Sequence, residues 1–132
     1  MIGLDTNVIV RYLAQDDPVQ SPIATRLIER LRPDAPGYVA AIVLAEVTWV
    51  MARSYKQSRE QLANIIEGLL RSSELMIEHA EAAYRALGRF RTSKSIDYAD
   101  VLIAEISTLA GAREIVTFDK RAAADGGMRL LK

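Results

Sequence analysis

The 132-residue chain contains no cysteine and a single histidine, His79, and these two shortages exclude several kinds of chemistry. Without cysteine the chain can form no disulfide, no zinc–thiolate site and no thiol nucleophile. With one histidine it cannot build a multi-histidine metal centre, so any metal bound here would be a hard cation with oxygen ligands. We expect His79 to cap or begin a helix rather than to act as a general base.

The chain also lacks a net charge and a long apolar run. Lys+Arg and Asp+Glu both number 17, so attraction of nucleic acid would need local basic patches or a metal. No segment approaches the roughly 18 apolar residues of a membrane helix, and the N-terminus has no signal-peptide features. These absences predict a cytoplasmic protein with no membrane partner. With one Trp and two Phe, an aromatic-lined sugar cleft of a glycoside hydrolase is a poor fit.

Short apolar runs alternate with helical patterns along the whole chain. Half of the residues are hydrophobic and 26% are charged, which is typical of a globular protein. With no hairpin signal between the strands, the alternation predicts a parallel sheet with helices on both faces, in a single α/β domain over residues 1–132. The expected strands are Ile2–Leu4, Tyr38–Val39, Leu75–Ile77, Ile115–Phe118 and Met128–Leu131. The expected helices include Val8–Ala14, Ala40–Ala52, one after a Ser58/Gln61 capping box, one over Ala80–Leu87, and Ala99–Ala110.

Two acidic residues follow predicted strands directly. Asp5 is the only charge in the opening stretch MIGLDTNVIV, and Asp119 follows Ile115–Phe118. A buried carboxylate without a partner is costly, so such residues are usually paired or bound to metal. Ligands of open α/β sheets lie at the carboxyl ends of the strands. We therefore interpret Asp5 and Asp119 as members of one cation site.

Glu46 is the only charged residue between Val39 and Ala52. A surface helix would carry a charge on every turn, so a solitary glutamate predicts a side chain that faces the interior or a cleft. The structural alternative is a glutamate at the edge of a core helix, paired with an arginine.

Asp97 and Asp100 lie three positions apart at the start of a predicted helix, and therefore on one face. Acidic side chains are favoured in a first helical turn, which explains one of them without a functional role. Asp100 is followed by Val101, Leu102 and Ile103, where the helix is expected to become buried. We interpret Asp100 as a ligand and Asp97 as a cap, a supporting residue or an additional ligand.

Carboxylates without histidine or cysteine suit Mg²⁺ or Mn²⁺. Converging negative charges raise one another's pKa unless a cation compensates them. Such a site serves attack by a metal-activated water on a phosphodiester.

These residues resemble the PIN-domain ribonucleases, specifically the VapC-type toxins of prokaryotic toxin–antitoxin pairs. The resemblance covers nearly the whole chain and rests on four segments in order, Leu4–Val8, Leu44–Val47, Asp97–Ala104 and Thr117–Lys120. It implies that Asp5, Glu46, Asp100 and Asp119 bind Mg²⁺ or Mn²⁺ and that Thr6, Asn7 and Thr117 orient carboxylates or the attacking water. It further implies an RNA substrate, a homodimer and a cognate antitoxin whose tail enters the acidic groove.

The chain departs from the family pattern just before the Glu46 helix. Related chains often carry a serine or threonine there, whereas Val39–Ile42 contains no hydroxyl. That function would be missing or supplied by Thr6 or Thr117.

Basic residues flank the acidic segments. As a hypothesis they form a rim that holds RNA phosphates, with ordinary solvated side chains as the alternative. The set is Arg89, Arg91 and Lys94 in a polar connection over Arg89–Ser95, and Lys120 with Arg121 after Asp119. Other side chains are expected in more structural places: Trp49 and Met51 in the core or a dimer contact, and Tyr98 in the groove or the core.

Competing α/β enzymes fit less well. A receiver-like module would need paired acids after the first strand, where Asp5 is followed by Thr6. A haloacid-dehalogenase-like phosphatase would need an aspartate where Asn7 stands. We therefore predict a metal-dependent endoribonuclease, with an RNA-processing nuclease and a non-catalytic regulatory module as alternatives.

Overall fold

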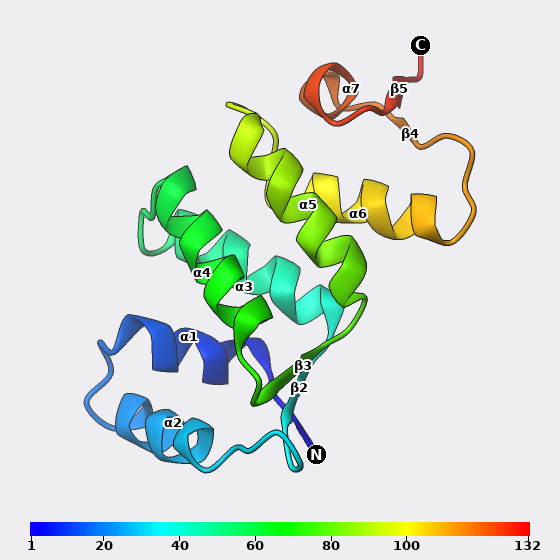
Figure 1. The fold of residues 1–132 in the computed structure, drawn as a ribbon. Helices are drawn as coiled ribbons and strands as arrows, with labels where there is room; N and C mark the ends of the chain where they lie inside the picture. The colour runs from blue at the N-terminus through cyan, green and yellow to red at the C-terminus, as the bar shows by residue number, and fades with distance from the viewer. The chain divides into compact units, whose positions relative to one another are not determined.

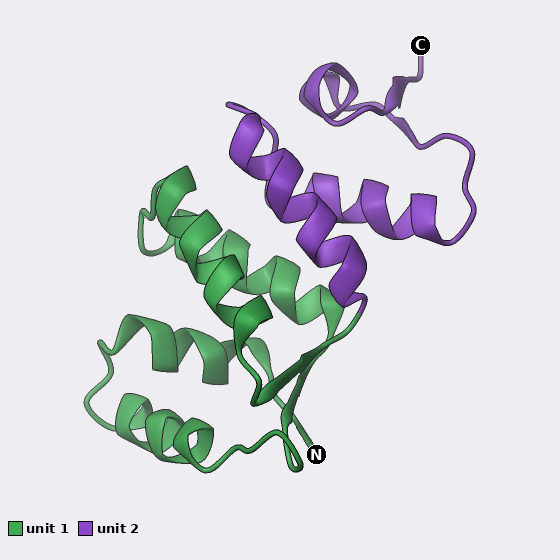
Figure 2. Cartoon of the chain, viewed as in Figure 1, with its two compact units in different colours: residues 1–78 green, residues 79–132 purple.

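Three short strands in the first part of the chain form a parallel sheet in the order β1-β2-β3. The structure is a computed structural model that describes residues 1–132. It consists of two compact units, Met1–Glu78 and His79–Lys132, and each is described by itself (Figure 2). Because each pair of sequential strands is joined through helices, the parallel arrangement follows from the connections.

The first unit contains three strands and four helices (Figure 1). Helix α1 packs against α2 and α3, and α3 packs against α4. In the sheet, Gly3 is in register with Tyr38, and Tyr38 with Met76. The elements are β1 (Ile2–Gly3), α1 (Thr6–Ala14), α2 (Gln20–Glu29), β2 (Gly37–Val39), α3 (Ala41–Arg53), α4 (Arg59–Arg71) and β3 (Leu75–Ile77).

The second unit contains three helices and a two-stranded parallel sheet, β4-β5. Helices α5 and α6 pack against each other, and Ala104, Ala122 and Met128 form a buried apolar cluster. The elements are α5 (Ala80–Thr92), α6 (Tyr98–Leu109), β4 (Val116–Thr117), α7 (Lys120–Asp125) and β5 (Arg129–Leu130).

The predicted α/β class with parallel strands is confirmed. The capping box of Ser58 and Gln61 begins α4 as predicted, and β3 has the predicted bounds. One detail differs: the expected polar connection over Arg89–Ser95 begins later, because α5 continues to Thr92. Alanines and apolar residues of α5 are buried as far as Phe90, and this packing extends the helix through the basic segment.

Candidate functional site

Asp5 lies between β1 and α1 and caps the helix. Its Oδ1 accepts a hydrogen bond from the backbone N–H of Thr6 at 2.8 Å. The side chain is exposed. An extended residue followed by a helix turns the chain at the end of β1, and that turn directs the Asp5 carboxylate away from the core.

Glu46 lies on α3 and accepts a hydrogen bond from a residue of α1. The Thr6 hydroxyl donates to Glu46 Oε1 at 2.8 Å. Glu46 is exposed and lines a cleft, so of the two predicted positions, the interior or a cleft, it takes the second. Its observed partner is a threonine hydroxyl and not the arginine of the structural alternative.

An open cleft of about 540 Å³ joins these two acids within the first unit. Val10 and Val50 contribute apolar surface to it. Its polar and charged lining includes Asp5, Thr6, Asn7, Arg11, Glu46 and Tyr55. The cleft therefore combines two carboxylates with one guanidinium.

Arg11 is the residue of this cleft that the sequence reasoning missed. It stands four positions after Asn7 on α1, and both line the cleft. That spacing places the two side chains on one helix face. The four-residue spacing from Asn7 is the sequence signal that could have identified it.

The N-terminus of α3, where the sequence has no hydroxyl, is capped by a carboxylate that follows β3. Glu78 Oε1 accepts a hydrogen bond from the backbone N–H of Ala41 at 2.8 Å. Glu78 follows β3. Burial raises the pKa of the neighbouring Tyr38 hydroxyl, and the negative charge of Glu78 raises it further. Glu78 thus does the helix-capping work that Ala40 cannot do.

The second unit holds the other acids. Asp119 caps α7, where its Oδ1 accepts hydrogen bonds from the backbone N–H groups of Arg121 at 2.8 Å and Ala122 at 3.3 Å. Thr117 Oγ1 accepts a 2.9 Å hydrogen bond from the backbone N–H of Asp119. Asp97 occupies the N-cap position of α6, but its side chain makes no capping hydrogen bond.

Asp100 is half-buried near two other carboxylates. Partial burial raises its pKa, and the negative charges of Asp97 and Asp119 raise it further, while the positive charge of Arg121 lowers it. The three aspartates thus form one local concentration of negative charge. A cation would relieve this repulsion.

The predicted metal-binding acids are divided between the units. Asp5 and Glu46 belong to the first, and Asp100 and Asp119 to the second. Within neither unit is a group of three or more Asp, Glu or His side chains arranged to hold a metal ion. The donors themselves are all carboxylate oxygens, which is the chemistry that Mg²⁺ and Mn²⁺ prefer.

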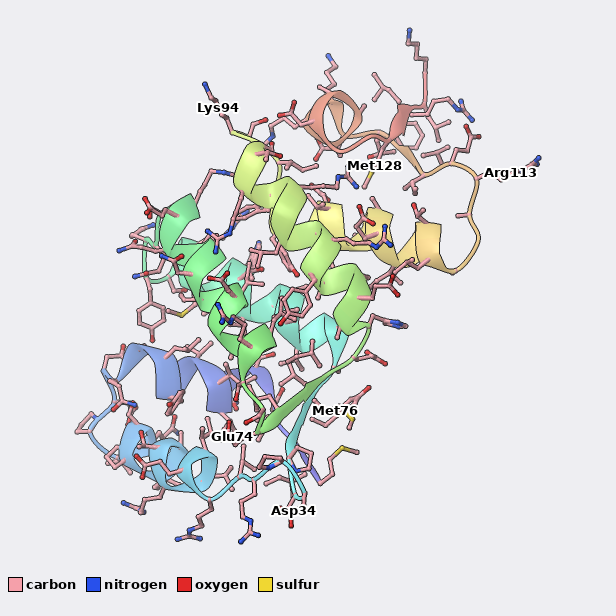
Figure 3. The ribbon with its side chains drawn as sticks, in the orientation of Figure 1. Asp34, Glu74, Met76, Lys94, Arg113 and Met128 are labelled. Atoms are coloured by element: carbon pink, nitrogen blue, oxygen red, sulfur yellow. The ribbon has the colours of Figure 1, made fainter.

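The hypothesis of a basic rim needs one correction. Arg89 Nη1 pairs with Glu105 Oε1 at 2.9 Å, and Nη2 donates to the carbonyl oxygen of Gly126 at 2.6 Å. Its guanidinium therefore holds α5, α6 and the end of α7 together. Lys94 and Lys120 are exposed, and Lys94 points away from the ribbon (Figure 3). Arg91 is exposed as well.

Tyr98, Met51 and Trp49, which were expected mainly in the core, differ in their burial. Tyr98 is buried, donates to the carbonyl oxygen of Ala83 at 2.9 Å and packs edge-on against Phe90. Met51 is buried, whereas Trp49 is 56% exposed, so it is not a core residue. The guanidinium of Arg53 lies 4.7 Å above its ring.

His79 precedes α5 as predicted and has a positive φ of 54°. Its side chain makes no capping hydrogen bond.

Comparison with known proteins gives one family. A sequence model described as "PIN domain" matches residues 2–125, which include all four predicted metal-binding acids. No curated protein matches the chain. None of the helices has both the length and the hydropathy that crossing a bilayer requires.

Proposed function

The chain belongs to the PIN domain family, and from this premise we propose that it is an endoribonuclease dependent on Mg²⁺ or Mn²⁺. PIN domains are generally nucleases that act on nucleic acid and typically use divalent cations. The match crosses the boundary between the two units, so we also propose that residues 1–132 work as one catalytic domain.

The observation that carries the proposal is the pairing of Asp5 and Glu46 in one cleft. These acids are 41 positions apart in sequence, yet both line the same opening. Thr6, at the start of α1, holds both of them, Asp5 through its backbone N–H and Glu46 through its hydroxyl. Two acids with only a structural role would be expected to pair with a lysine or arginine side chain, or to lie apart. Here the two carboxylates stand exposed in a cleft, as cation ligands must.

Asp5, Glu46, Asp100 and Asp119 would hold the cation. When bound, Mg²⁺ or Mn²⁺ would activate a water for attack on phosphorus and stabilise the leaving oxygen. The carboxylate donors fit it. The negative charges of Asp97 and Asp119, which add to the effect of burial in raising the pKa of Asp100, are charges that a cation would compensate. Asp97 would support this group from the start of α6.

The chain's own residues orient these acids. Thr6 holds one oxygen of Glu46 and thereby limits the rotation of its carboxylate. The backbone N–H groups of α7 hold Oδ1 of Asp119 in the same way. Fixed carboxylates reduce the conformational entropy lost when a substrate phosphate arrives.

Cleavage of a single-stranded RNA by the purified chain tests the proposal. We expect cleavage with Mg²⁺ or Mn²⁺, no cleavage in EDTA, and products with a 5′-phosphate and a 3′-hydroxyl. Activity that survives EDTA, or that persists in Asp5→Asn at the wild-type rate, would overturn it.

We further propose that the enzyme is the toxin of a toxin–antitoxin pair, acting as a homodimer and neutralised by a cognate antitoxin. The support is the VapC-like sequence pattern, in which the LDTNV segment and the Asp97–Ala104 segment are both present. Induction in a bacterial host should arrest growth, and Asp5→Asn should relieve the arrest. Normal growth combined with RNase activity in vitro would instead favour an RNA-processing enzyme.

A further inference from the structure

We propose that Arg11 is the phosphate-binding residue of the Asp5–Glu46 cleft and holds a backbone phosphate of single-stranded RNA beside the one that is cleaved. This inference rests on the proposed ribonuclease function and adds a residue to it. Arg11 is the one basic side chain among the residues that line the cleft.

The guanidinium of Arg11 is held mainly by neutral groups. Its Nε donates to Gln20 Oε1 at 2.8 Å, and its Nη1 donates to the hydroxyl of Tyr55 at 3.3 Å. Asp16 and Asp17 lie at 3.9 Å, the outer limit of an ion pair. The two short contacts are with uncharged groups and the two carboxylates lie farther away, so a phosphate oxygen that approaches the guanidinium directly can compete with Asp16 and Asp17.

The surroundings fix Arg11 in place before any ligand arrives. The Tyr55 hydroxyl, which accepts from Arg11, donates in turn to Asp16 Oδ2 at 3.0 Å. At the backbone, the buried Ser21 hydroxyl donates to the carbonyl oxygen of Arg11 at 2.8 Å. Tyr55 is therefore a positioning residue, and ligand binding would order little that is not already ordered.

The charge of the cleft explains why an arginine is needed there. Asp5 and Glu46 repel a polyanion, and the chain has no net positive charge to offset that repulsion. A guanidinium binds phosphate oxygens with paired N–H donors. The side chain of Arg11 is 32% exposed, so a phosphate can reach it while the residue stays packed on α1.

The test compares Arg11→Gln with Arg26→Gln. Glutamine keeps a polar side chain while removing the charge, and Arg26 is an exposed arginine of α2 that does not line the cleft. Binding of a short fluorescent single-stranded RNA is followed by anisotropy in EDTA over a salt series, and KM for cleavage is measured in Mg²⁺.

We expect Arg11→Gln to weaken RNA binding about five- to tenfold. The slope of log K against log salt concentration, which is the salt dependence meant here, should become less steep by about 0.7, the value for one phosphate of a single strand. KM should rise more than kcat falls. Tyr55→Phe should weaken binding without changing the salt dependence, because the charge stays. Arg26→Gln should match the wild type.

Each failure has a distinct meaning. If Arg11→Gln keeps the wild-type salt dependence and KM while the wild type cleaves RNA, the inference is wrong and the proposed function stands. If the wild type neither binds nor cleaves RNA, both are wrong. If Arg11→Gln does not fold, Arg11→Lys replaces it, and the inference then requires weaker RNA binding, because an ammonium group cannot donate to two phosphate oxygens as a guanidinium does. RNA binding of Arg11→Lys at the wild-type affinity would overturn the inference.

Discussion

The hydroxyl of Thr6 donates a 2.8 Å hydrogen bond to Oε1 of Glu46, a residue 40 positions away in the sequence. The backbone N–H of Thr6 also donates a hydrogen bond to Oδ1 of Asp5. One threonine at the first position of α1 therefore contacts both carboxylates that line the cleft. This arrangement couples the conformation of Glu46 to the beginning of α1.

Removal of this hydroxyl should impair catalysis more than folding. Thr6→Val keeps the shape of the side chain but cannot donate to Glu46, so the carboxylate loses its fixed orientation. We expect activity or metal affinity to fall by about 10- to 100-fold, as for other residues that orient metal ligands. Thr6→Ser keeps the donor and should retain most activity. Equal activity in Thr6→Val and the wild type would show that the hydrogen bond has no catalytic role.

Neutralising Asp5 should abolish cleavage and leave the fold intact. Asparagine still accepts the hydrogen bond from Thr6 at the helix cap, so α1 keeps its start. The loss of a cation ligand should reduce metal-dependent cleavage by roughly a hundredfold or more. Asp34→Asn, in an exposed turn of the same unit, is the matched control. Thermal melts of the three proteins should agree, and a collapsed melt for Asp5→Asn would assign Asp5 a structural role instead.

Asp100→Asn should have opposite effects with and without metal. Its raised pKa means that ionising this carboxyl opposes folding, so this part of the stability is present below the unfolded-state pKa and is lost as pH rises through the raised value. Without metal at neutral pH and low salt, the variant should melt about 1–3 °C higher.

The metal should reverse this order. At about a hundred times its Kd, the cation should stabilise the wild type by about 2.7 kcal/mol, and Asp100→Asn should lose most of this gain. Differential scanning fluorimetry across a Mg²⁺ series from pH 4 to 8 measures both effects. An equal metal-induced shift in both proteins would remove Asp100 from the set of ligands.

Substitutions of Arg89 and Lys94 should have different effects, the first on stability and the second on RNA binding. Arg89→Ala breaks the contacts with Glu105 and Gly126 and should cost about 1.5–3 kcal/mol of stability, as for other hydrogen bonds of charged groups. Lys94→Ala should leave the melting temperature unchanged, because Lys94 is exposed at the end of α5. If Lys94 belongs to a basic rim, its loss should reduce the salt dependence of RNA binding. A stable Arg89→Ala variant would contradict the structural role of Arg89.

Local features of the fold were predictable because their partners lie within a few residues. The Ser58–Gln61 capping box depends on hydrogen bonds across three positions, and β3 is a short apolar run between polar residues. In each case the residue types alone determine the most stable local conformation.

The sequence by itself determined the α/β class, the order of the elements and the candidate acids, since these depend on periodicity and on local side-chain chemistry. Only the tertiary structure decided which distant side chains meet. It paired Thr6 with Glu46, directed Arg11 into the cleft and committed Arg89 to Glu105. The physical reason is that such contacts depend on how helices pack, and the same exposed arginine can meet a carboxylate, a carbonyl or solvent according to that packing.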